Sequence, residues 1–212
     1  MEIINFEGLD KSGKKTQSDM LYEYLKSKGY KVYKTEFHRY DTPTGQLIRK
    51  WLDKEYEVDQ ITIELIMTAD KQAQQNLFKQ LEKEGYDYLI LDRYTWSQRV
   101  YSSATNPFKG FNQSAYQTWI ENISKYIKEP DYVIYLDVSV EESMLRKGEH
   151  GENDRYESDK ELLNRVREEY LDMITGNIFS ENSYFRIDGS QPTEEVWEEV
   201  KDVFELNIKG DK

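Results

Sequence analysis

The chain of 212 residues contains no cysteine and only two histidines, His38 and His150. The absence of cysteine excludes disulfide bonds and thiolate chemistry, and two histidines argue against a histidine-rich zinc site. No apolar run approaches the roughly 20 residues of a membrane-spanning helix. Residues 1–6 carry neither the basic segment nor the long apolar stretch of a secretion signal. These absences predict a cytoplasmic protein without a membrane partner.

Positive charge is also scarce, because 29 lysines and arginines face 41 aspartates and glutamates, a net charge of −12. Such a field repels nucleic-acid backbones and anionic membranes. We therefore expect no nucleic-acid partner, and phosphate binding requires basic residues to converge on one pocket. Hydrophobic residues make up 37% and charged residues 33%, which together with the length predicts one globular domain over residues 1–212.

Short apolar segments alternate with longer amphipathic ones. Five of the short segments predict strands: Glu2–Phe6, Lys31–Phe37, Tyr88–Asp92, Tyr132–Asp137 and Tyr184–Ile187. Helices are predicted around Met20–Leu25, Trp119–Ile127, Leu162–Ile174 and Val196–Phe204. The alternation predicts an α/β fold, in which a parallel sheet has helices on both faces and ligands bind at the carboxyl ends of the strands.

The longest predicted helix runs from Ile61 to Leu81, where apolar residues recur every four positions. Its predicted apolar face consists of Ile61, Leu65, Ala69, Ala73, Leu77 and Leu81. The segment from Arg146 to Ser158 is different, since it has two glycines, many charges and no apolar face. It is predicted to be a loop, either a solvated connector or, because of its basic residues, a mobile lid.

Strand one is followed by Gly8-Leu9-Asp10-Lys11-Ser12-Gly13-Lys14-Lys15-Thr16, which has the spacing of a phosphate-binding loop. Gly8 and Gly13 allow the backbone to fold tightly, so that N–H groups at the start of the next helix point at a phosphate. Lys14 is placed to reach the β and γ phosphates. The ATP-binding residues predicted from this loop are Gly8, Ser12, Gly13, Lys14, Lys15 and Thr16.

Lys15 stands where such loops usually carry the Ser or Thr whose hydroxyl touches Mg²⁺. One interpretation is an inactive site. The other is an active site whose magnesium is held through water and phosphates, with Lys15 turned to solvent and Thr16 serving the phosphates. We favour the second.

The motifs beyond the loop carry a resemblance to a known family. In order along the chain they are Phe6–Gln17, Thr42–Gly45, Asp92-Arg93-Tyr94, Asp154-Arg155-Tyr156-Glu157 and Ile187–Pro192. The sequence resembles the thymidylate kinases. This resemblance implies a five-stranded parallel sheet flanked by helices with a short lid over about 146–158, and a homodimer. It also implies that ATP and dTMP are converted to ADP and dTDP with Mg²⁺, in deoxynucleotide synthesis.

The resemblance also implies roles on the phosphate side. Lys11 stands where some members carry an arginine that stabilises the transition state, and Arg155 and Arg146 are lid cations that could share this charge. Asp92 resembles the acidic residue that orients the magnesium shell, through water. Gln191 lies in the loop that holds the adenine of ATP. Asp137 also ends a strand, but no motif includes it, so it is expected to be structural.

On the acceptor side, the resemblance makes Arg93 the clamp on the acceptor phosphate and Asp10 the acceptor for the sugar 3′-hydroxyl. Ser97 and Tyr101 lie one helical turn apart and approach the base and sugar, where an aromatic ring would exclude a 2′-hydroxyl. Tyr101 could equally be a core residue. The predicted walls of the pocket are Phe37, Leu52 and Tyr156.

Three positions depart from the family pattern near the base. Met67 and Lys71 stand where a Phe and a thymine-reading Arg are typical, and Lys is a point donor rather than a fork. Arg39, within Phe37-His38-Arg39-Tyr40, is the candidate phosphate-binding arginine of an altered motif. These departures leave open a kinase for a 5-modified dUMP or for a broader set of deoxynucleotides.

Two other classes of protein are compatible with a phosphate loop. A nucleotide-binding regulator that lost turnover through Lys15 would bind ATP without transferring phosphate. However, Lys14, Asp92, Arg93 and a lid arginine are all retained, which favours an enzyme. A GTPase or motor is disfavoured because the chain has no Asn-Lys-x-Asp guanine motif.

Overall fold

The computed structural model describes residues 1–108, 113–147, 155–156, 159–176 and 183–209. All five strands form one parallel sheet in the order β2-β3-β1-β4-β5. Their bounds are β1 Glu2–Glu7, β2 Val32–Glu36, β3 Tyr88–Asp92, β4 Tyr132–Asp137 and β5 Tyr184–Asp188. The predicted α/β class and each predicted strand are confirmed, with ends that differ by one residue or none.

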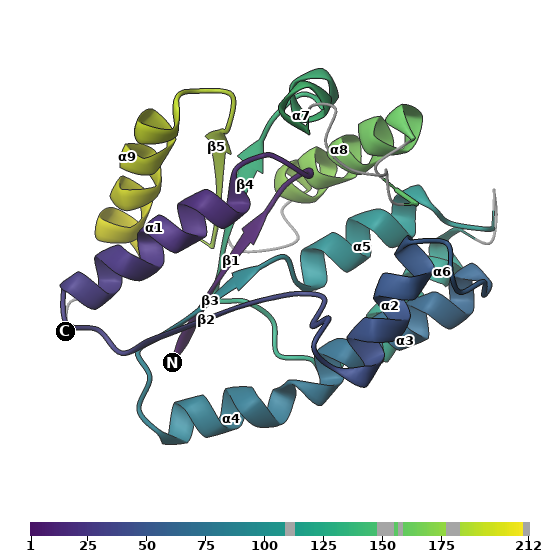
Figure 1. The fold of residues 1–212 in the computed structure, drawn as a ribbon, viewed down its shortest axis with the longest axis horizontal. Coiled ribbons are helices and arrows are strands. Elements are labelled where there is room, and N and C mark those ends of the chain that lie inside the picture. The colour runs from purple at the N-terminus through teal and green to yellow at the C-terminus, as the bar shows by residue number, and fades with distance from the viewer. Residues whose placement is uncertain (109–112, 148–154, 157–158, 177–182, 210–212) are drawn as a thin grey trace.

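Helices connect the strands and cover both faces of the sheet (Figure 1). In the described part of the chain they are α1 Lys14–Ser27, α2 Pro43–Leu52, α3 Gln60–Ala73, α4 Gln75–Lys83, α5 Thr95–Ala104, α6 Gln113–Ser124, α7 Val140–Lys147, α8 Lys160–Thr175 and α9 Thr193–Val203. A π-helical turn over Phe204–Ile208 follows α9.

Alternation along each strand sends side chains to opposite faces of the sheet. On one face Ile4 and Phe6 pack with residues of α1 and α9, and on the other Ile3 packs with α4. Val133 and Tyr135 of β4 pack on that second face with α5 and α8. Because both of their faces are buried, the central strands β3 and β4 are nearly continuous apolar runs.

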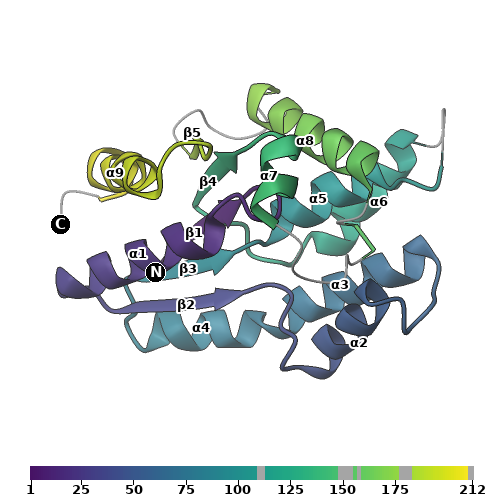
Figure 2. The same cartoon turned by 45° about the horizontal axis from the view of Figure 1, so that its top comes forward.

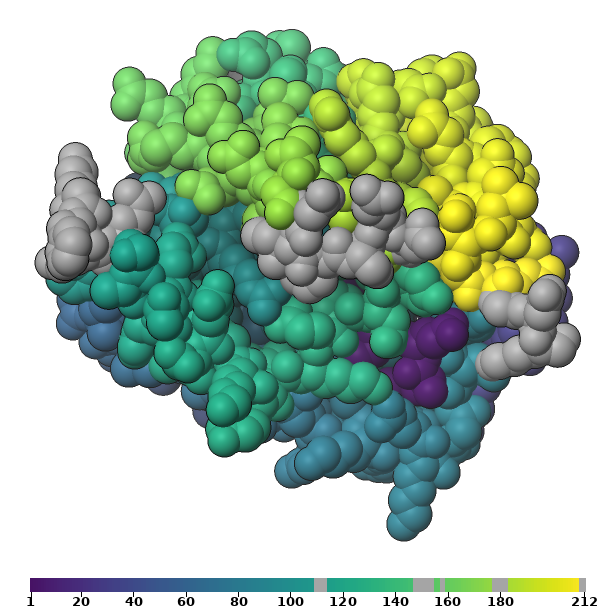
Figure 3. All heavy atoms as spheres, turned by 180° about the vertical axis from the view of Figure 1, so that it is seen from behind, coloured from purple at the N-terminus to yellow at the C-terminus, as the bar shows by residue number. Residues whose placement is uncertain are grey.

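The carboxyl ends of the strands meet at one edge of the sheet, and the phosphate loop follows β1 in its centre. Figure 2 shows the loop beside α7 and α5, with α2 and α3 extending beyond the sheet on the same side. The N-terminus lies at the opposite end of the strands, and from behind it reaches the surface between the blue α4 and the yellow α9 (Figure 3). The site is therefore built at the edge where α/β folds bind ligands.

The predicted long helix over 61–81 is two helices, α3 and α4, separated at Gln74. Its predicted apolar face is wrong within α3. Leu65 is 47% exposed, whereas Glu64 and Lys71 are 1% exposed. Helix α3 buries a stripe of mixed polarity because it faces a site rather than the sheet.

Two other boundaries differ from prediction. Arg146 and Lys147 end helix α7, so the segment predicted as a loop begins inside a helix. Helix α6 ends at Ser124, which leaves buried Ile127 outside it. The rest of the predicted lid, including Asp154 and Glu157, lies outside the described residues apart from 155–156. Within the described residues, no helix is long and apolar enough to cross a membrane.

Candidate active site

The phosphate loop turns sharply between β1 and α1. Gly8, Lys11 and Gly13 have φ values of 146°, 60° and 98°. A Cβ atom at Gly8 would lie 2.6 Å from the carbonyl oxygen of Leu136, so no side chain fits there. Gly13 is the N-cap of α1 and offers no side-chain cap. The first N–H groups of the helix are therefore left for an anion.

Lys14 lies inside this loop and is 6% exposed. Its Nζ donates hydrogen bonds to the carbonyl oxygens of Gly8 at 3.2 Å and Leu9 at 2.6 Å. Burial, followed by the positive charge of Arg93, lowers the pKa of Lys14 to about 8. The buried Ser12 Oγ has no hydrogen-bond partner in the described structure. Phosphate oxygens would satisfy both groups, so the loop fits the phosphate chain of a nucleotide.

A cavity of about 580 Å³ opens over the loop. Ser143 of α7 donates from Oγ to the carbonyl oxygen of Asp10 at 2.6 Å, which ties that helix to the loop. In the same helix Arg146 donates from Nε to Glu142 at 2.9 Å. The cavity brings together most of the predicted phosphate-side residues, namely Lys11, Gly13, Lys14, Lys15, Thr16, Asp92, Arg93 and Arg146.

Lys15 is turned outward, with its side chain 77% exposed and its Nζ 2.9 Å from Asp19. Thr16 is also exposed. Asp92 ends β3 beside Phe6 of β1, because the two strands pair in parallel register. Its carboxylate is the ligand type that Mg²⁺ prefers. The described residues contain no group of three or more His, Cys, Asp or Glu that could hold a metal, so phosphates and water would complete a shell at Asp92.

Arg93 stands between this cavity and the neighbouring pocket. Its guanidinium donates to Asp10 Oδ1 at 2.6 Å and to Ser97 Oγ at 3.1 Å, and lies 5.7 Å from the centre of the Tyr101 ring. Its backbone has φ 62° and its N–H donates to the carbonyl oxygen of Phe6. Asp10 raises the pKa of Arg93, whereas burial opposes this, so the side chain stays a cation. A buried cationic fork suits the oxygens of a phosphate.

The sequence motifs assign no role to Glu7, yet this carboxylate organises the site. It is 0% exposed and accepts hydrogen bonds from the backbone N–H groups of Tyr94 and Ser97, at 2.9 and 3.1 Å. It also accepts from the hydroxyls of Ser97 and Tyr170, at 2.5 and 2.8 Å. Glu7 thereby fixes the segment that carries Arg93. A charged residue at the end of a strand predicted to lie in the centre of the sheet was the available signal.

A second cavity of about 100 Å³ lies beside the first and is the predicted acceptor pocket. Tyr101 and Tyr156 pack against each other in its wall, with ring centres 5.0 Å apart. Phe37 and Leu52 are buried in its wall. Eight of the predicted substrate-binding residues line it together: Asp10, Phe37, Leu52, Met67, Arg93, Ser97, Tyr101 and Tyr156.

Arg39 and Lys71 do not line this pocket. The guanidinium of Arg39 donates hydrogen bonds to the side chains of Asp41 and Gln74, at 2.9 to 3.3 Å. Arg39 lines a separate cavity of about 660 Å³ between α1 and the β2–α2 segment. Lys71 is buried, and among the residues that the structure describes its Nζ donates only a long bond, 3.4 Å, to the carbonyl oxygen of Met67. The positions of both differ from the prediction that they bind the acceptor.

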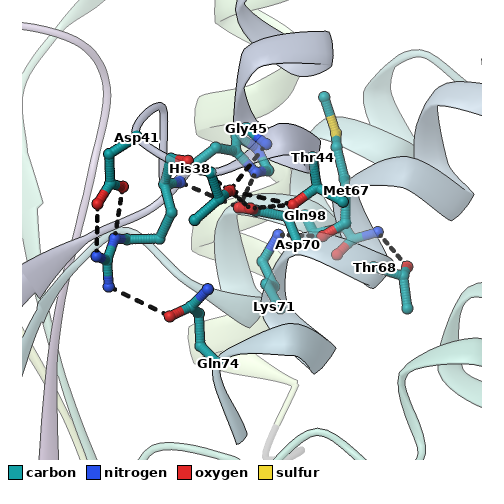
Figure 4. Close-up of polar contacts among 12 residues, drawn as sticks. His38, Asp41, Thr44, Gly45, Met67, Thr68, Asp70, Lys71, Gln74 and Gln98 are labelled. Carbon is teal, nitrogen blue, oxygen red and sulfur yellow. Dashed lines mark hydrogen bonds and ion pairs between the residues drawn. The ribbon is translucent and has the colours of Figure 1, made fainter. Parts of the chain in front are cut away.

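Buried Asp70 explains why the β2–α2 segment takes this path (Figure 4). It accepts hydrogen bonds from Arg39 N at 3.1 Å, Thr42 Oγ1 at 3.1 Å and Thr44 Oγ1 at 2.8 Å. Although burial raises the pKa of Asp70, His38 and these donors outweigh it and lower the pKa to about 2. Asp70 therefore anchors the segment that places Phe37 against the pocket.

Arg155 and Gln191 also lie away from the cavity over the phosphate loop. Arg155 donates to the carbonyl oxygen of Trp51 at 3.0 Å and to Glu57 at 2.6 Å, and its guanidinium stacks 4.7 Å from the Trp51 ring centre. Gln191 donates to Glu199 at 2.6 Å. In this structure Arg155 fastens residues 155–156 to the end of α2. Its role at the transferred phosphate stays a prediction.

Asp137, expected to be structural, accepts from Arg167 at 2.8 Å and from Arg186 at 3.1 Å. These bonds tie the end of β4 to α8 and β5.

Four residues that line the acceptor pocket are not predicted by the sequence, namely His38, Tyr40, Glu64 and Gln98. Glu64 and Gln98 were missed because a polar residue on a helix is ordinarily exposed. The signal for Glu64 was a second stripe on α3, formed with Met67 and Lys71, and only the fold decides which stripe is buried.

Comparisons with known proteins agree with this geometry. The sequence profile described as thymidylate kinase matches residues 6–200. A probable thymidylate kinase from Methanococcus aeolicus is 33% identical, over 94% of this chain and 93% of the relative. A thymidylate kinase from Plasmodium falciparum is 31% identical, over 100% of this chain and 93% of the relative.

Among solved structures, a thymidylate kinase from Candida albicans superimposes with a TM-score of 0.81 at 25% identity. The match covers 98% of this chain and 92% of the other. The Candida enzyme is described as having a broad substrate specificity. The family profile, the full-length relatives and the shared fold agree with the motifs and with the paired cavities. The chain belongs to the thymidylate kinase family.

Proposed function

We propose that this protein transfers the γ-phosphoryl group of ATP to dTMP, giving ADP and dTDP for deoxynucleotide synthesis. One observation carries the proposal. Asp10 and Arg93 line both the cavity over the phosphate loop and the acceptor pocket. A donor phosphate chain in the first and an acceptor phosphate at the mouth of the second would therefore meet at Arg93.

Catalysis of such a transfer consists of positioning and charge neutralisation. The backbone of Gly8–Gly13 and the ammonium of Lys14 would hold the donor phosphates, and Arg93 would hold the acceptor phosphate. Lys11, exposed at the rim of the cavity, would meet the charge that develops between them. Bound Mg²⁺ would neutralise phosphate oxygens, with Asp92 orienting its water shell.

Other predicted roles belong to the same proposal. Asp10 would accept from the sugar 3′-hydroxyl, while Ser97 and Tyr101 would face the sugar. Arg146 would join the phosphate cations from α7. For Gln191 to contact the adenine of ATP, and for Arg155 to reach the phosphates, each would have to leave its present partner. The homodimer and the cytoplasmic location are also part of this proposal.

The test is a coupled assay of ADP release with ATP, Mg²⁺ and a panel of dTMP, dUMP, 5-hydroxymethyl-dUMP, dCMP, dAMP and dGMP. Turnover that is highest with dTMP supports the proposal. ATP binding without turnover of any acceptor contradicts it and would favour an inactive nucleotide-binding protein. In that case Lys15→Thr would be the first substitution to test for recovery of activity.

A second candidate is a kinase with a broader or modified deoxypyrimidine acceptor. It is favoured by the soft Met67 in the pocket wall and by the absence of Lys71 from the pocket lining. In the same panel, turnover of 5-hydroxymethyl-dUMP or dUMP above that of dTMP would select this alternative.

A further inference from the structure

The side chain of His38 borders two cavities. It is 17% exposed and lines both the acceptor pocket and the cavity of about 660 Å³ between α1 and the β2–α2 segment. Its Nδ1 atom is buried and lies 3.4 Å from Oδ2 of Asp70, a residue that is 0% exposed. The exposed side of the ring is therefore the side that carries Nε2. Within the part of the chain that the structure describes, no residue forms a hydrogen bond with Nε2.

The charges around the ring decide which nitrogen carries the proton. Burial, followed by the positive charge of Lys71, lowers the pKa of His38 to about 4. The imidazole is therefore neutral at pH 7 and has one N–H group. Asp70 remains ionised because its pKa is about 2. Although 3.4 Å is longer than an ordinary hydrogen bond, this charge favours the proton on Nδ1. Nε2 is consequently a hydrogen-bond acceptor that faces a cavity.

Helix α3 places His38 at one end of the pocket wall. Glu64, Met67 and Asp70 follow one another at intervals of three positions, so consecutive members are neighbours on the helix surface. Glu64 and Met67 line the pocket, and His38 lies against Asp70, one turn beyond Met67. A base packed on Met67 would have Glu64 and Gln98 at one edge and His38 at the other. The carboxyl and amide groups suit the N3 and O4 edge of a pyrimidine, which leaves the C5 edge toward His38.

We propose that the acceptor pocket also takes deoxyuridylates that carry a hydrogen-bond donor on C5, of which 5-hydroxymethyl-dUMP is the simplest, and that Nε2 of His38 accepts this hydrogen bond. The inference rests on the proposed function, because it assumes that the pocket holds the base of the acceptor. A hydroxymethyl group buried without a partner is unfavourable, and His38 supplies the partner. The cavity beyond His38 leaves room for the added oxygen. When dTMP is bound, water in that cavity can satisfy Nε2 instead.

The kinetic test compares kcat/KM for 5-hydroxymethyl-dUMP and dTMP, which share phosphate and sugar and differ by one hydroxyl. In the wild-type protein we expect the two values to agree within about threefold. In His38→Phe, the ratio of the 5-hydroxymethyl-dUMP value to the dTMP value should fall about tenfold, because the variant keeps an aromatic ring and removes the acceptor. Leu52→Met is the matched control, since it alters the same pocket without changing a hydrogen-bonding group and should leave the ratio unchanged.

A second measurement needs neither turnover nor a variant of His38. The chain has only two histidines, His38 and His150, so protein labelled with ¹⁵N-histidine gives a simple NMR spectrum, and His150→Gln assigns the His38 signals. Without nucleotide at pH 7, the ring nitrogens should show the neutral form with its proton on Nδ1. Saturating 5-hydroxymethyl-dUMP should move the Nε2 signal toward that of a hydrogen-bonded nitrogen, and dTMP should move it much less.

The outcomes distinguish failure of the inference from failure of the proposed function. If wild-type protein turns over dTMP but His38→Phe keeps the wild-type ratio, the inference is overturned and the proposed function stands. The same holds if bound 5-hydroxymethyl-dUMP leaves the Nε2 signal where dTMP leaves it. If wild-type protein turns over neither nucleotide, the proposed function fails and the inference fails with it.

Discussion

The phosphate loop and the acceptor pocket adjoin each other but are built in different ways. The loop occupies consecutive residues, and its shape depends on the backbone conformation at Gly8 and Gly13. The acceptor pocket gathers side chains from the β2–α2 segment, from helices α2, α3 and α5, and from Asp10, Arg93 and Tyr156. The loop follows the family pattern apart from Lys15, which points outward. The departures Met67 and Lys71 belong to the acceptor side, where one lines the pocket and the other does not.

This difference indicates in which part of the site substitutions are tolerated. Phosphate is the same ligand in every kinase of this type, and backbone N–H groups recognise it without depending on side chains. The base is recognised by a few side chains, which can be exchanged if another group supplies the hydrogen bond. We therefore expect substitutions of Gly8, Gly13 and Lys14 to lower transfer to every acceptor, and substitutions on α3 and α5 to change which acceptor is used.

The largest expected effect is that of Lys14→Met. Removing the buried ammonium from the phosphate loop should lower kcat by about 1000-fold with every acceptor, because charge neutralisation dominates this chemistry. The matched control is Lys15→Met, which alters an exposed side chain and should change kcat by less than about threefold. Steady-state assays of both variants with dTMP and dUMP check this. If the loss of kcat in Lys14→Met differed between dTMP and dUMP, the proposed difference between the phosphate loop and the acceptor pocket would be contradicted.

The next effect separates two candidate transition-state cations. Lys11 lines the cavity over the loop, whereas Arg155 is bound to Glu57 and Trp51. We expect Lys11→Met to lower kcat about 100-fold and Arg155→Met to lower it less than about fivefold, since its present contacts are structural. Single-turnover rates at saturating ATP measure the chemical step. The reverse ranking would show that Arg155 leaves Glu57 when substrates bind.

A smaller effect concerns pH. Lys14 is charged below its pKa of about 8 and neutral above it. ATP binds the charged form more tightly, so affinity should be constant near pH 6.5 and fall about tenfold between pH 7 and 9. Calorimetric titration of the protein with ATP across this range measures it. Lys14→Met should remove the dependence; if it persists in that variant, another group is responsible.

The smallest effect is on stability. The pKa of Asp70 falls from 3.8 in an unfolded chain to about 2. The contribution of its ionised form, about 2 kcal/mol, is fully present above pH 4 and is lost as the pH falls from about 4 to about 2. Asp70→Asn should lower the free energy of unfolding by about this amount at pH 7, measured by urea unfolding. Exposed Asp41→Asn is the control and should change it little.

Several features could be predicted from the sequence because they depend on neighbouring residues or on short periodicities. The strands were recognisable as apolar runs, and the loop as a spacing of glycines and lysine. The buried face of α3 could not be predicted in this way. Its residues form two stripes, and contacts with α5 and α2 bury the stripe that contains Glu64 and Lys71.

The same limit applies to side-chain direction. Arg39 lies in a motif next to the pocket, yet hydrogen bonds to the side chains of Asp41 and Gln74 hold its guanidinium outside the pocket. Gln98 follows Ser97 directly in the sequence, but the orientation of its side chain depends on Glu64, 34 positions away. Contacts between residues so far apart in the sequence depend on the packed fold, and the pattern of a single sequence does not predict them.

The most direct test of the account follows the phosphoryl group itself. The protein is incubated with Mg²⁺ and ATP labelled in the γ-phosphate, with and without dTMP, and the labelled products are separated by chromatography. The account predicts that label appears on dTDP, and that without dTMP it stays on ATP. Label released only as inorganic phosphate, or retained on ATP despite saturating dTMP, would contradict transfer between the two cavities.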